Sequence, residues 1–220
     1  NAFQQKMQMG REVIADRGIW TAKKRYILNV HDNEGVRLAQ PKLKMMGIET
    51  AKSSTPQWVR DKLSKALEVV MRGTEQELWE FVETARKDFR NLPPEEVAFP
   101  RGCKGLIQYQ CPTNIYSKGT PIHVRGSLLY NHLLKSKNLD MRYEMIKNGE
   151  KVHFAYLTMP NPINENVISF TSVLPREFDL HRFIDYDMQF EKSFVEPLKA
   201  IVQLINWNVE PVASLDSFFG

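Results

Sequence analysis

Three cations stand side by side where a strand is expected to begin. In the stretch TAKKRYILNV, Lys23, Lys24 and Arg25 open an alternating apolar segment, and Tyr26 follows them. Such cations neutralise phosphates, and a long side chain with a tyrosine hydroxyl beside it can reach the acceptors that every base pair presents in the minor groove. The alternative is an edge strand that lysines protect against aggregation, and on charge alone that alternative is preferred.

A pair of carboxylates suggests a metal. Asp185 and Asp187, in IDYDM, have a two-residue spacing, and paired aspartates hold the two Mg²⁺ ions of many phosphoryl-transfer sites. They lie, however, at the start of an amphipathic helical pattern, where acidic residues stabilise the helix dipole without a metal. We therefore expect no catalytic residue and no metal site in this chain.

The cysteines and histidines predict no further site. Cys103 and Cys111, with His123 downstream, match no usual zinc spacing, and the other histidines are scattered. Two reduced thiols are expected. With no secretory signal and no run of about 18 apolar residues, the expected location is the cytoplasm, that of the host cell if the protein is viral.

The charge is distributed unevenly along the 220 residues, whose net charge is +4. Residues 1–62 hold 12 Lys and Arg against 6 Asp and Glu, whereas residues 63–220 hold 18 against 20. A basic N-terminal third favours a polyanionic partner, and a solvated basic face is an equally good explanation before the motifs are considered.

Two elements are expected to position the cationic stretch. Residues 3–17 have a helical apolar pattern that Gly18 is expected to end. Residues 25–31 and 36–40 alternate and flank HDNEG, in which Gly35 can adopt the positive φ of a hairpin turn.

Two longer helices are predicted next. Ser54 or Thr55 can cap the first, which begins near Pro56 and ends at Gly73. Thr74-x-x-Glu77 is a capping box that opens the second.

The remaining elements are expected to be shorter and separated by loops. Residues 92–122 are expected to form loops with room for a short strand, and a helix is expected at 127–135. Two strands follow in KVHFAYLT and NVISFTSVL. A long helix at about 180–206, kinked near Pro197, and an unstructured tail end the chain. The fold class is therefore α+β: a small basic β-hairpin region, a boundary near residue 50, and a mostly helical domain with a few short strands.

Five motifs in succession resemble a known family. KKRYILNV and PKLKMMGIETAKSSTP resemble the segment of family B DNA polymerases that leaves the palm and enters the thumb, closest to the replicative polymerases of T-even-like bacteriophages. The similarity continues through PIHVRGSLLYN and FIDYDMQFEKSFVEPL and ends with the tail ASLDSFFG. The resemblance covers nearly the whole chain. It implies C-terminal palm elements at 1–50, a thumb domain at 51–208 and a flexible clamp-binding tail at 209–220.

The resemblance also implies roles for particular residues. Duplex-tracking residues would be Lys23, Lys24, Arg25 and Tyr26, with Tyr26 near the primer terminus, and further primer-strand contacts would be Lys44 and Lys52. Ser53, Ser54 and Thr55 fit both a helix cap and a phosphate contact.

A second phosphate site is expected at His123 and Arg125, just before a helix start at Gly126; the alternative is an arginine buried against an acidic neighbour. Leu215, Phe218 and Phe219 would insert into a sliding clamp, unless the aromatic terminus folds back on its own domain.

The function expected from this resemblance is to grip primer–template duplex DNA and to tether a polymerase to its sliding clamp. The family's catalytic aspartates would lie upstream of Asn1, so the chain alone is expected to be inactive and to hold no cofactor, while the complete enzyme would use Mg²⁺. The expected partners are duplex DNA, an upstream part with the exonuclease, palm and fingers, and the clamp, with no membrane. One rival is a stand-alone, non-catalytic nucleic-acid-binding protein, and a weaker one is a structural protein whose tail recruits a ring partner.

Overall fold

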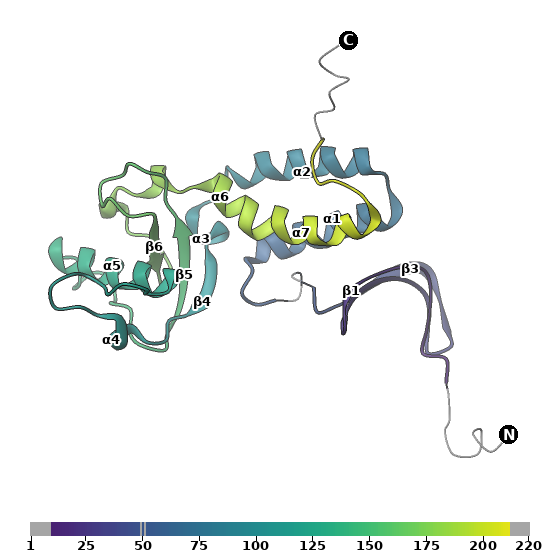
Figure 1. Cartoon of the computed structure of the whole chain (residues 1–220), viewed down its shortest axis with the longest axis horizontal. Helices are drawn as coiled ribbons and strands as arrows, with labels where there is room; N and C mark the ends of the chain where they lie inside the picture. The colour runs from purple at the N-terminus through teal and green to yellow at the C-terminus, as the bar shows by residue number, and fades with distance from the viewer. Residues whose placement is uncertain (1–9, 49, 51, 212–220) are drawn as a thin grey trace, which may run out of the picture. The chain divides into compact units, whose positions relative to one another are not determined.

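The computed structural model describes residues 10–48, 50 and 52–211 and divides the chain into two units, each built from separated segments. Unit 1 takes its described residues from 1–52, 63–82 and 198–220, and unit 2 consists of 53–62 and 83–197. Each unit contains one antiparallel three-stranded sheet together with helices (Figure 1). The expected α+β class is confirmed.

The sheet of unit 1 is a meander of long strands. Its strands are β1 (Val13–Ala22), β2 (Arg25–Asn33) and β3 (Val36–Met46), in the order β1-β2-β3. The turn between β2 and β3 contains Gly35 at φ 84°, and its amide donates to Asp32 Oδ1 at 2.9 Å, which confirms the expected hairpin. Register shifts interrupt both strand pairs, and the strands are visibly bent in Figure 1.

The helix expected at 3–17 is wrong over its described second half. Val13 begins β1, and Gly18 lies inside that strand, opposite Leu28, instead of ending a helix. Shifts of register between Ile14 and Arg17 break the alternation that identifies a strand, so local periodicity is misleading here. Residues 3–9 lie outside the described part.

Two helices follow as expected: α1 (Gln57–Arg72) and α2 (Glu75–Phe89). Both bonds of the capping box form: the Thr74 amide donates to Glu77 Oε2 at 2.7 Å, and the Glu77 amide donates to Thr74 Oγ1 at 3.3 Å. In unit 1 the core includes almost fully buried side chains from α1, α2 and α7 (Glu196–Val202): Leu63, Leu67, Val70, Leu78, Val82, Leu198, Ile201 and Val202.

The segment after α7 is tied to α2 within unit 1. It contains η5 (Gln203–Ile205) and ends the described chain at residue 211. The Trp79 indole donates to the Asn208 carbonyl at 2.8 Å, and the Asn208 amide donates to Glu75 Oε1 at 2.6 Å. These two bonds join residues more than 120 positions apart in the sequence.

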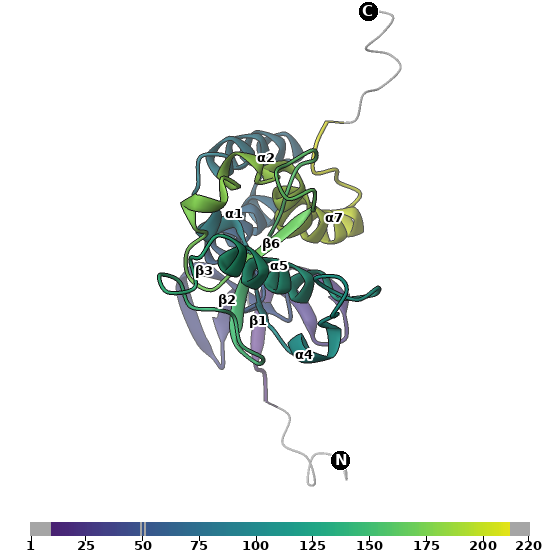
Figure 2. The same ribbon diagram turned by 90° about the vertical axis from the view of Figure 1, so that its left-hand side faces the viewer.

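Unit 2 is built on a shorter sheet, β4 (Phe99–Gly102), β5 (Lys151–Tyr156) and β6 (Val167–Phe170), in the order β4-β5-β6. The helix α5 (Ile122–Ser136) packs on β6 and β5, and Figure 2 shows it in front of β6. Aromatic residues fill the core, with Phe190 stacked on Phe194 at 4.8 Å and Tyr130 edge-on to Phe178 at 5.6 Å. Short elements complete the unit: α3 (Pro94–Val97), α4 (Leu106–Tyr109), η2 (Arg176–Phe178), η3 (His181–Phe183), α6 (Tyr186–Phe190) and η4 (Glu191–Val195).

Two boundaries in this half differ from expectation. The helix α5 begins at Ile122, five residues before the expected start, with Pro121 as its N-cap. The helical path expected from residue 180 begins at Tyr186 and includes a π-helical turn, η4, directly before the residues Glu196 and Pro197. Proline has no amide hydrogen to continue an α-helical ladder, so a wider turn before it is physically reasonable.

Candidate nucleic-acid interface

The cations of KKRY lie at an exposed turn. The strands β1 and β2 pair as far as Ala22 opposite Arg25, so Lys23 and Lys24 form the two-residue connection. Lys23, Lys24 and Arg25 are exposed, and Tyr26 is half-buried. Their positive charges are therefore available to a ligand.

Two backbone features shape this cationic turn (Lys23, Lys24 and Arg25). Lys24 adopts φ 62°, a left-handed conformation that costs a side-chain-bearing residue roughly 1–2 kcal/mol. Gly47, at φ 65°, lies so close to the turn that a Cβ there would be 2.6 Å from the Lys24 carbonyl oxygen. Gly47 is thus a supporting residue that sequence reasoning missed, although a glycine at the end of a strand pattern is a signal for a turn or a close backbone approach.

Cross-strand pairing connects Lys44 with the cationic turn. Tyr26 lies opposite Met46 on β3, and Leu28 lies opposite Lys44, so Tyr26 and Lys44 share one face of the sheet. The Lys44 ammonium is 4.0 Å from the Glu12 carboxylate. Lys52 is the other residue of this unit that was expected to contact the primer strand, and it is half-buried.

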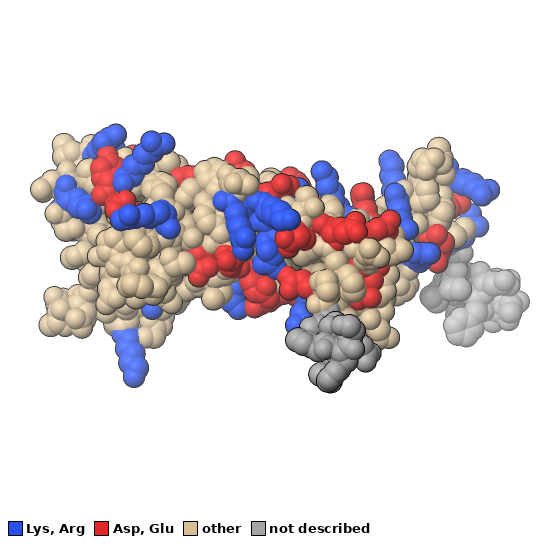
Figure 3. Space-filling view, turned by 90° about the horizontal axis from the view of Figure 1, so that it is seen from above, with Lys and Arg blue, Asp and Glu red and all other residues tan. Residues whose placement is uncertain are grey.

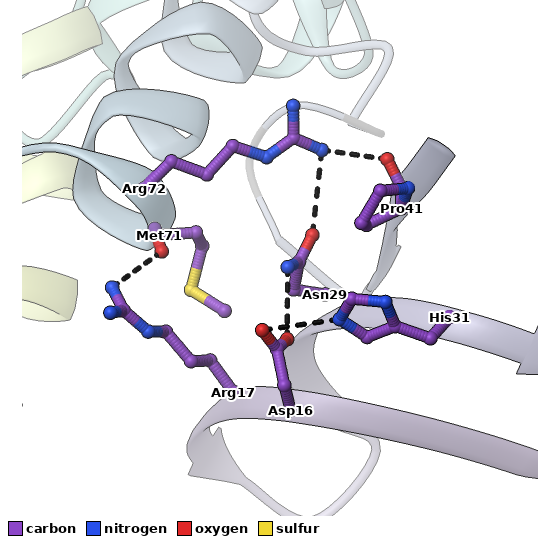
Figure 4. Close-up of polar contacts among 7 residues, drawn as sticks. All are labelled: Asp16, Arg17, Asn29, His31, Pro41, Met71 and Arg72. Carbon is purple, nitrogen blue, oxygen red and sulfur yellow. Dashed lines mark hydrogen bonds and ion pairs between the residues drawn. The ribbon is translucent and has the colours of Figure 1, made fainter. Parts of the chain in front are cut away.

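Two arginines fasten the sheet of unit 1 to the C-terminal end of α1 (Figure 4). Arg17, on β1, donates to the Met71 carbonyl at 2.9 Å, one of the carbonyls that the helix leaves unpaired. Arg72, on α1, donates back to the Pro41 carbonyl in β3 at 2.7 Å. We call Arg17 and Arg72 the arginine clasp, because each element contributes one donor to the other.

A buried amide extends this contact into the sheet. Arg72 also reaches Asn29 Oδ1 at 3.4 Å, Asn29 Nδ2 donates to Asp16 Oδ1 at 2.9 Å, and His31 Nε2 lies 3.1 Å from Asp16 Oδ2 (Figure 4). Hydrogen bonding to His31, and then to Asn29, lowers the pKa of Asp16 from its usual 3.8. The network fixes β1 against β2 beside the bulge at Asp16.

In unit 2, the residues Ser53 and Thr55 line a cavity of about 540 Å³ at the start of α1. Arg60 and His153 line the same cavity, but so do three carboxylates, Asp61, Glu95 and Glu96. These acids weaken the attraction that a helix N-terminus has for an anion. Ser54 is engaged through its carbonyl, which accepts from Arg101 Nη1 at 2.9 Å.

Arg101 is a second residue that the sequence did not reveal. Its guanidinium lies 6.0 Å from the rings of both Phe99 and Phe154. Burial, and then the positive charge of Arg101, lower the pKa of His123 below its usual 6.5, so this imidazole is neutral at pH 7. His123 therefore carries no charge with which to hold a phosphate.

The second phosphate site was expected before a helix start, and this placement is wrong. Arg125 and Gly126 lie inside α5, where the Arg125 amide already donates to the Pro121 carbonyl. The Arg125 guanidinium donates to Asn166 Oδ1 and lies over the Tyr116 ring, so its partner is an amide and not the acidic neighbour of the alternative. A Cβ on Gly126 would be 2.5 Å from Ser169 Oγ; glycine is needed for helix–sheet packing.

The acidic pair takes part in helix capping. Asp185 accepts from the Met188 amide at 2.9 Å as the N-cap of α6, and Asp187 pairs with Arg90 at 2.7 Å. Among the described residues, no group of three His, Cys, Asp or Glu could hold a metal ion. Cys103 and Cys111 are free thiols.

The clamp-binding residues expected in the tail, Leu215, Phe218 and Phe219, lie outside the described residues. Within that described part, no helix is both long and apolar enough to cross a membrane. On the face seen in Figure 3, Lys and Arg are interspersed with Asp and Glu over much of the surface.

The class defined so far is an α+β protein with an exposed cationic turn on a bent antiparallel sheet. Its sequence is 34% identical, over 92% of the chain, to a DNA-directed DNA polymerase of Enterobacteria phage T4. It is 35% identical, over 100% of the chain, to a DNA-directed DNA polymerase of Escherichia phage RB69.

These relatives confirm the likeness to the polymerases of T-even-like phages. The chain spans only 22% and 25% of their lengths, so it is related to about a quarter of such a polymerase. No family model matches the chain.

Proposed function

We propose that this chain is the duplex-holding, C-terminal part of a family B phage-type DNA polymerase. Palm elements would occupy 1–50, the thumb 51–208 and a clamp-binding tail 209–220. The observation that carries the proposal is the cationic turn, whose three side chains are exposed and whose backbone is held in shape by Gly47. The similarity to phage polymerases along the whole chain supports it.

The chemistry of the grip is electrostatic and indifferent to sequence. Lys23, Lys24 and Arg25 would neutralise backbone phosphates, and the Tyr26 hydroxyl would contact the minor groove near the primer end. Lys44, on the same face as Tyr26, would extend the contact along the primer strand. Lys52 and the segment 53–55 would add contacts where the chain enters α1.

His123, Arg125 and Gly126 are not carried into the proposed contact. The first is neutral at pH 7, the second is engaged by Asn166, and the third is packed against Ser169. Arg101 is engaged in the same way, because its guanidinium donates to the Ser54 and Pro100 carbonyls.

The complete polymerase would carry out nucleotidyl transfer with Mg²⁺ on aspartates outside this chain. The chain alone would be inactive, and its partners would be primer–template DNA, the upstream polymerase part and a sliding clamp. Complementation tests this division of labour. Mixing the chain with an upstream part that carries the palm aspartates should restore primer extension. Tight duplex binding without any complementation would instead favour a stand-alone DNA-binding protein.

Duplex binding by the 220-residue chain tests the grip directly. The triple variant Lys23→Ala, Lys24→Ala, Arg25→Ala should lower duplex affinity at least about tenfold and reduce the slope of log K against log salt by about 2–3. A matched control, Lys135→Ala, Lys137→Ala, Lys147→Ala, removes the same charge from exposed positions of unit 2. Equal losses in both variants would mean that net charge, and not the cationic turn, determines binding.

A further inference from the structure

An exposed tryptophan, Trp20, lies over Gly18 on the sheet of unit 1. Trp20 is 64% exposed, the most accessible of the large aromatic side chains described as exposed. A Cβ on Gly18 would meet the indole at 2.6 and 2.7 Å, and it would meet Leu28 Cδ2 at 2.8 Å. The six-membered ring therefore covers Gly18, and any larger residue at position 18 would displace it. The absence of a side chain at Gly18 makes room for the outer edge of the indole.

Strand alternation assigns Trp20 to the face turned away from α1. Arg17, which bonds Met71 on α1, pairs with the buried Asn29, and the neighbouring pair Ile19 and Ile27 is also buried. The alternate positions belong to the opposite face.

The residues around the indole on this face combine apolar surface with positive charge. Trp20 lies opposite Tyr26, which lies opposite Met46, itself 45% exposed. The next row is Gly18, Leu28 and Lys44. The acid that reaches this face is Glu12, which is 77% exposed and 4.0 Å from Lys44. We call Gly18, Trp20, Tyr26, Leu28, Lys44 and Met46 the Trp20 platform.

This composition selects the kind of ligand. A flat aromatic ring beside cations binds nucleobases, because every base has a π-face and every phosphate a negative charge. A base inside a duplex has both of its faces covered by its neighbours, so only an unpaired base can stack on an indole. The platform is also continuous with the cationic turn, since the Trp20 row lies next to the Ala22–Arg25 pair that closes the turn.

We propose that the Trp20 platform binds single-stranded DNA by stacking an unpaired base on the Trp20 indole, with Lys44 beside the adjoining phosphate. The inference rests on the proposed function, because it assumes that the neighbouring cationic turn holds DNA. It adds to that function a separate place for bases that have left the duplex.

The test compares two DNA probes bound to the 220-residue chain. The first is an oligothymidylate, and the second is a dumbbell duplex closed at both ends by non-nucleotide linkers, so that it has no free ends and no unpaired bases. Trp20→Ala should weaken oligothymidylate binding about 5- to 100-fold and leave the dumbbell affinity within about twofold. Trp20→Phe should retain most of the affinity, whereas Trp20→Leu, which is apolar without a π-face, should not.

Two further variants guard against trivial explanations. Gly18→Ala keeps the tryptophan but displaces the ring, so it should weaken oligothymidylate binding as Trp20→Ala does. Val36→Ala removes another exposed apolar side chain of the same sheet and should change neither probe. Circular dichroism checks that each variant is folded. A base that stacks on Trp20 should quench tryptophan fluorescence when oligothymidylate binds, and loss of that quenching in Trp20→Ala reports the stacking directly.

The outcomes separate this inference from the proposed function. Unchanged oligothymidylate binding by Trp20→Ala overturns the platform while leaving the cationic turn's role intact. An equal loss on the dumbbell also overturns it, because Trp20 would then contact the duplex. If sedimentation shows that Trp20→Ala dissociates a dimer, the occupant is a second copy of the chain. If the triple variant of the cationic turn loses no duplex affinity, the proposed function itself fails, whatever Trp20 does.

Discussion

Single residues in this chain combine a backbone requirement with a chemical one, and Lys24 is the clearest case. Its φ of 62° suits glycine, yet the position holds a lysine in the middle of the cationic turn. The backbone cost is tolerated where a positive charge is available to a ligand. Stability and binding therefore need to be measured separately at this position.

Replacing Lys24 separates the two requirements. Lys24→Gly and Lys24→Ala remove the same charge, so both should weaken duplex binding to the same extent. Lys24→Gly should be more stable than Lys24→Ala by about 1 kcal/mol in urea denaturation, because alanine keeps the unfavourable left-handed conformation. Equal stabilities would show that the backbone of the turn rearranges freely.

Asp16 links the stability of the sheet to pH. Its pKa is lowered in the folded chain, so its stabilising contribution is present above the ordinary value of 3.8 and is lost as pH falls through the folded value. Asp16→Asn should therefore be less stable than the parent chain at pH 7, and the difference should shrink below about pH 3.8. Urea midpoints measured against pH test this. His31→Ala removes the contact of Asp16 with His31, so its stability should depend on pH in the same way. A stability difference from the parent chain that widens in acid would contradict the role assigned to Asp16.

At the scale of elements, the arginine clasp determines how the unit 1 sheet is attached to α1. Each arginine donates to a backbone carbonyl of the other element, so neither bond depends on the partner's side chain. Charge-assisted bonds of this kind are directional, and a lysine cannot reach two acceptors with the same fork.

Arg72→Ala should lower the free energy of unfolding by about 1 kcal/mol, since the side chain is exposed and its bonds are partly screened. Amide hydrogen exchange should accelerate in β2 and β3, where Asn29 and Pro41 lose their donor. Arg72→Lys should restore little of the protection. Arg37→Ala, an exposed arginine of the same sheet, is the control; an equal acceleration there would rule out a specific clasp.

Sequence patterns predicted the elements whose signals are local. The helices α1 and α2 carry their own boundaries in Pro56, Gly73 and the Thr74–Glu77 box, and all of these agree with the structure. β1 was missed because its bulge disrupts alternation and its pairing with β2 is the interaction that defines it. The start of α5 was missed because Gly126 looked like a boundary, whereas it is a packing position against Ser169.

The candidate site, like the fold, could be predicted only in part. The exposed cations at 23–25 could be identified from residue type alone. Gly47 and Trp20 could not, because the case for each comes from what lies against it across the strands. Sequence reasoning also counted His123 among the candidate phosphate ligands, and it could not supply the partial burial that lowers the pKa of this imidazole.

At the scale of the whole molecule, the assignment of palm, thumb and tail stays a prediction. The tail gives it a sharp test. Deleting residues 214–220 should abolish stimulation by the sliding clamp without changing simple primer extension by the reconstituted polymerase, because the apolar residues of the tail would no longer enter the clamp. Replacing Leu215, Phe218 and Phe219 with serine should have the same effect. Loss of basal extension would contradict a role confined to the clamp.

The composition of unit 1 has a consequence for the order in which the protein can fold on the ribosome. Its helical part requires Trp79 and Glu75 to meet Asn208, and Leu198, Ile201 and Val202 to become buried. Unit 2, made of residues 53–62 and 83–197, is synthesised in full before residues 198–208. Synthesis therefore offers unit 2 a complete set of its own contacts before it offers them to unit 1, whose helical part also needs residues 198–208.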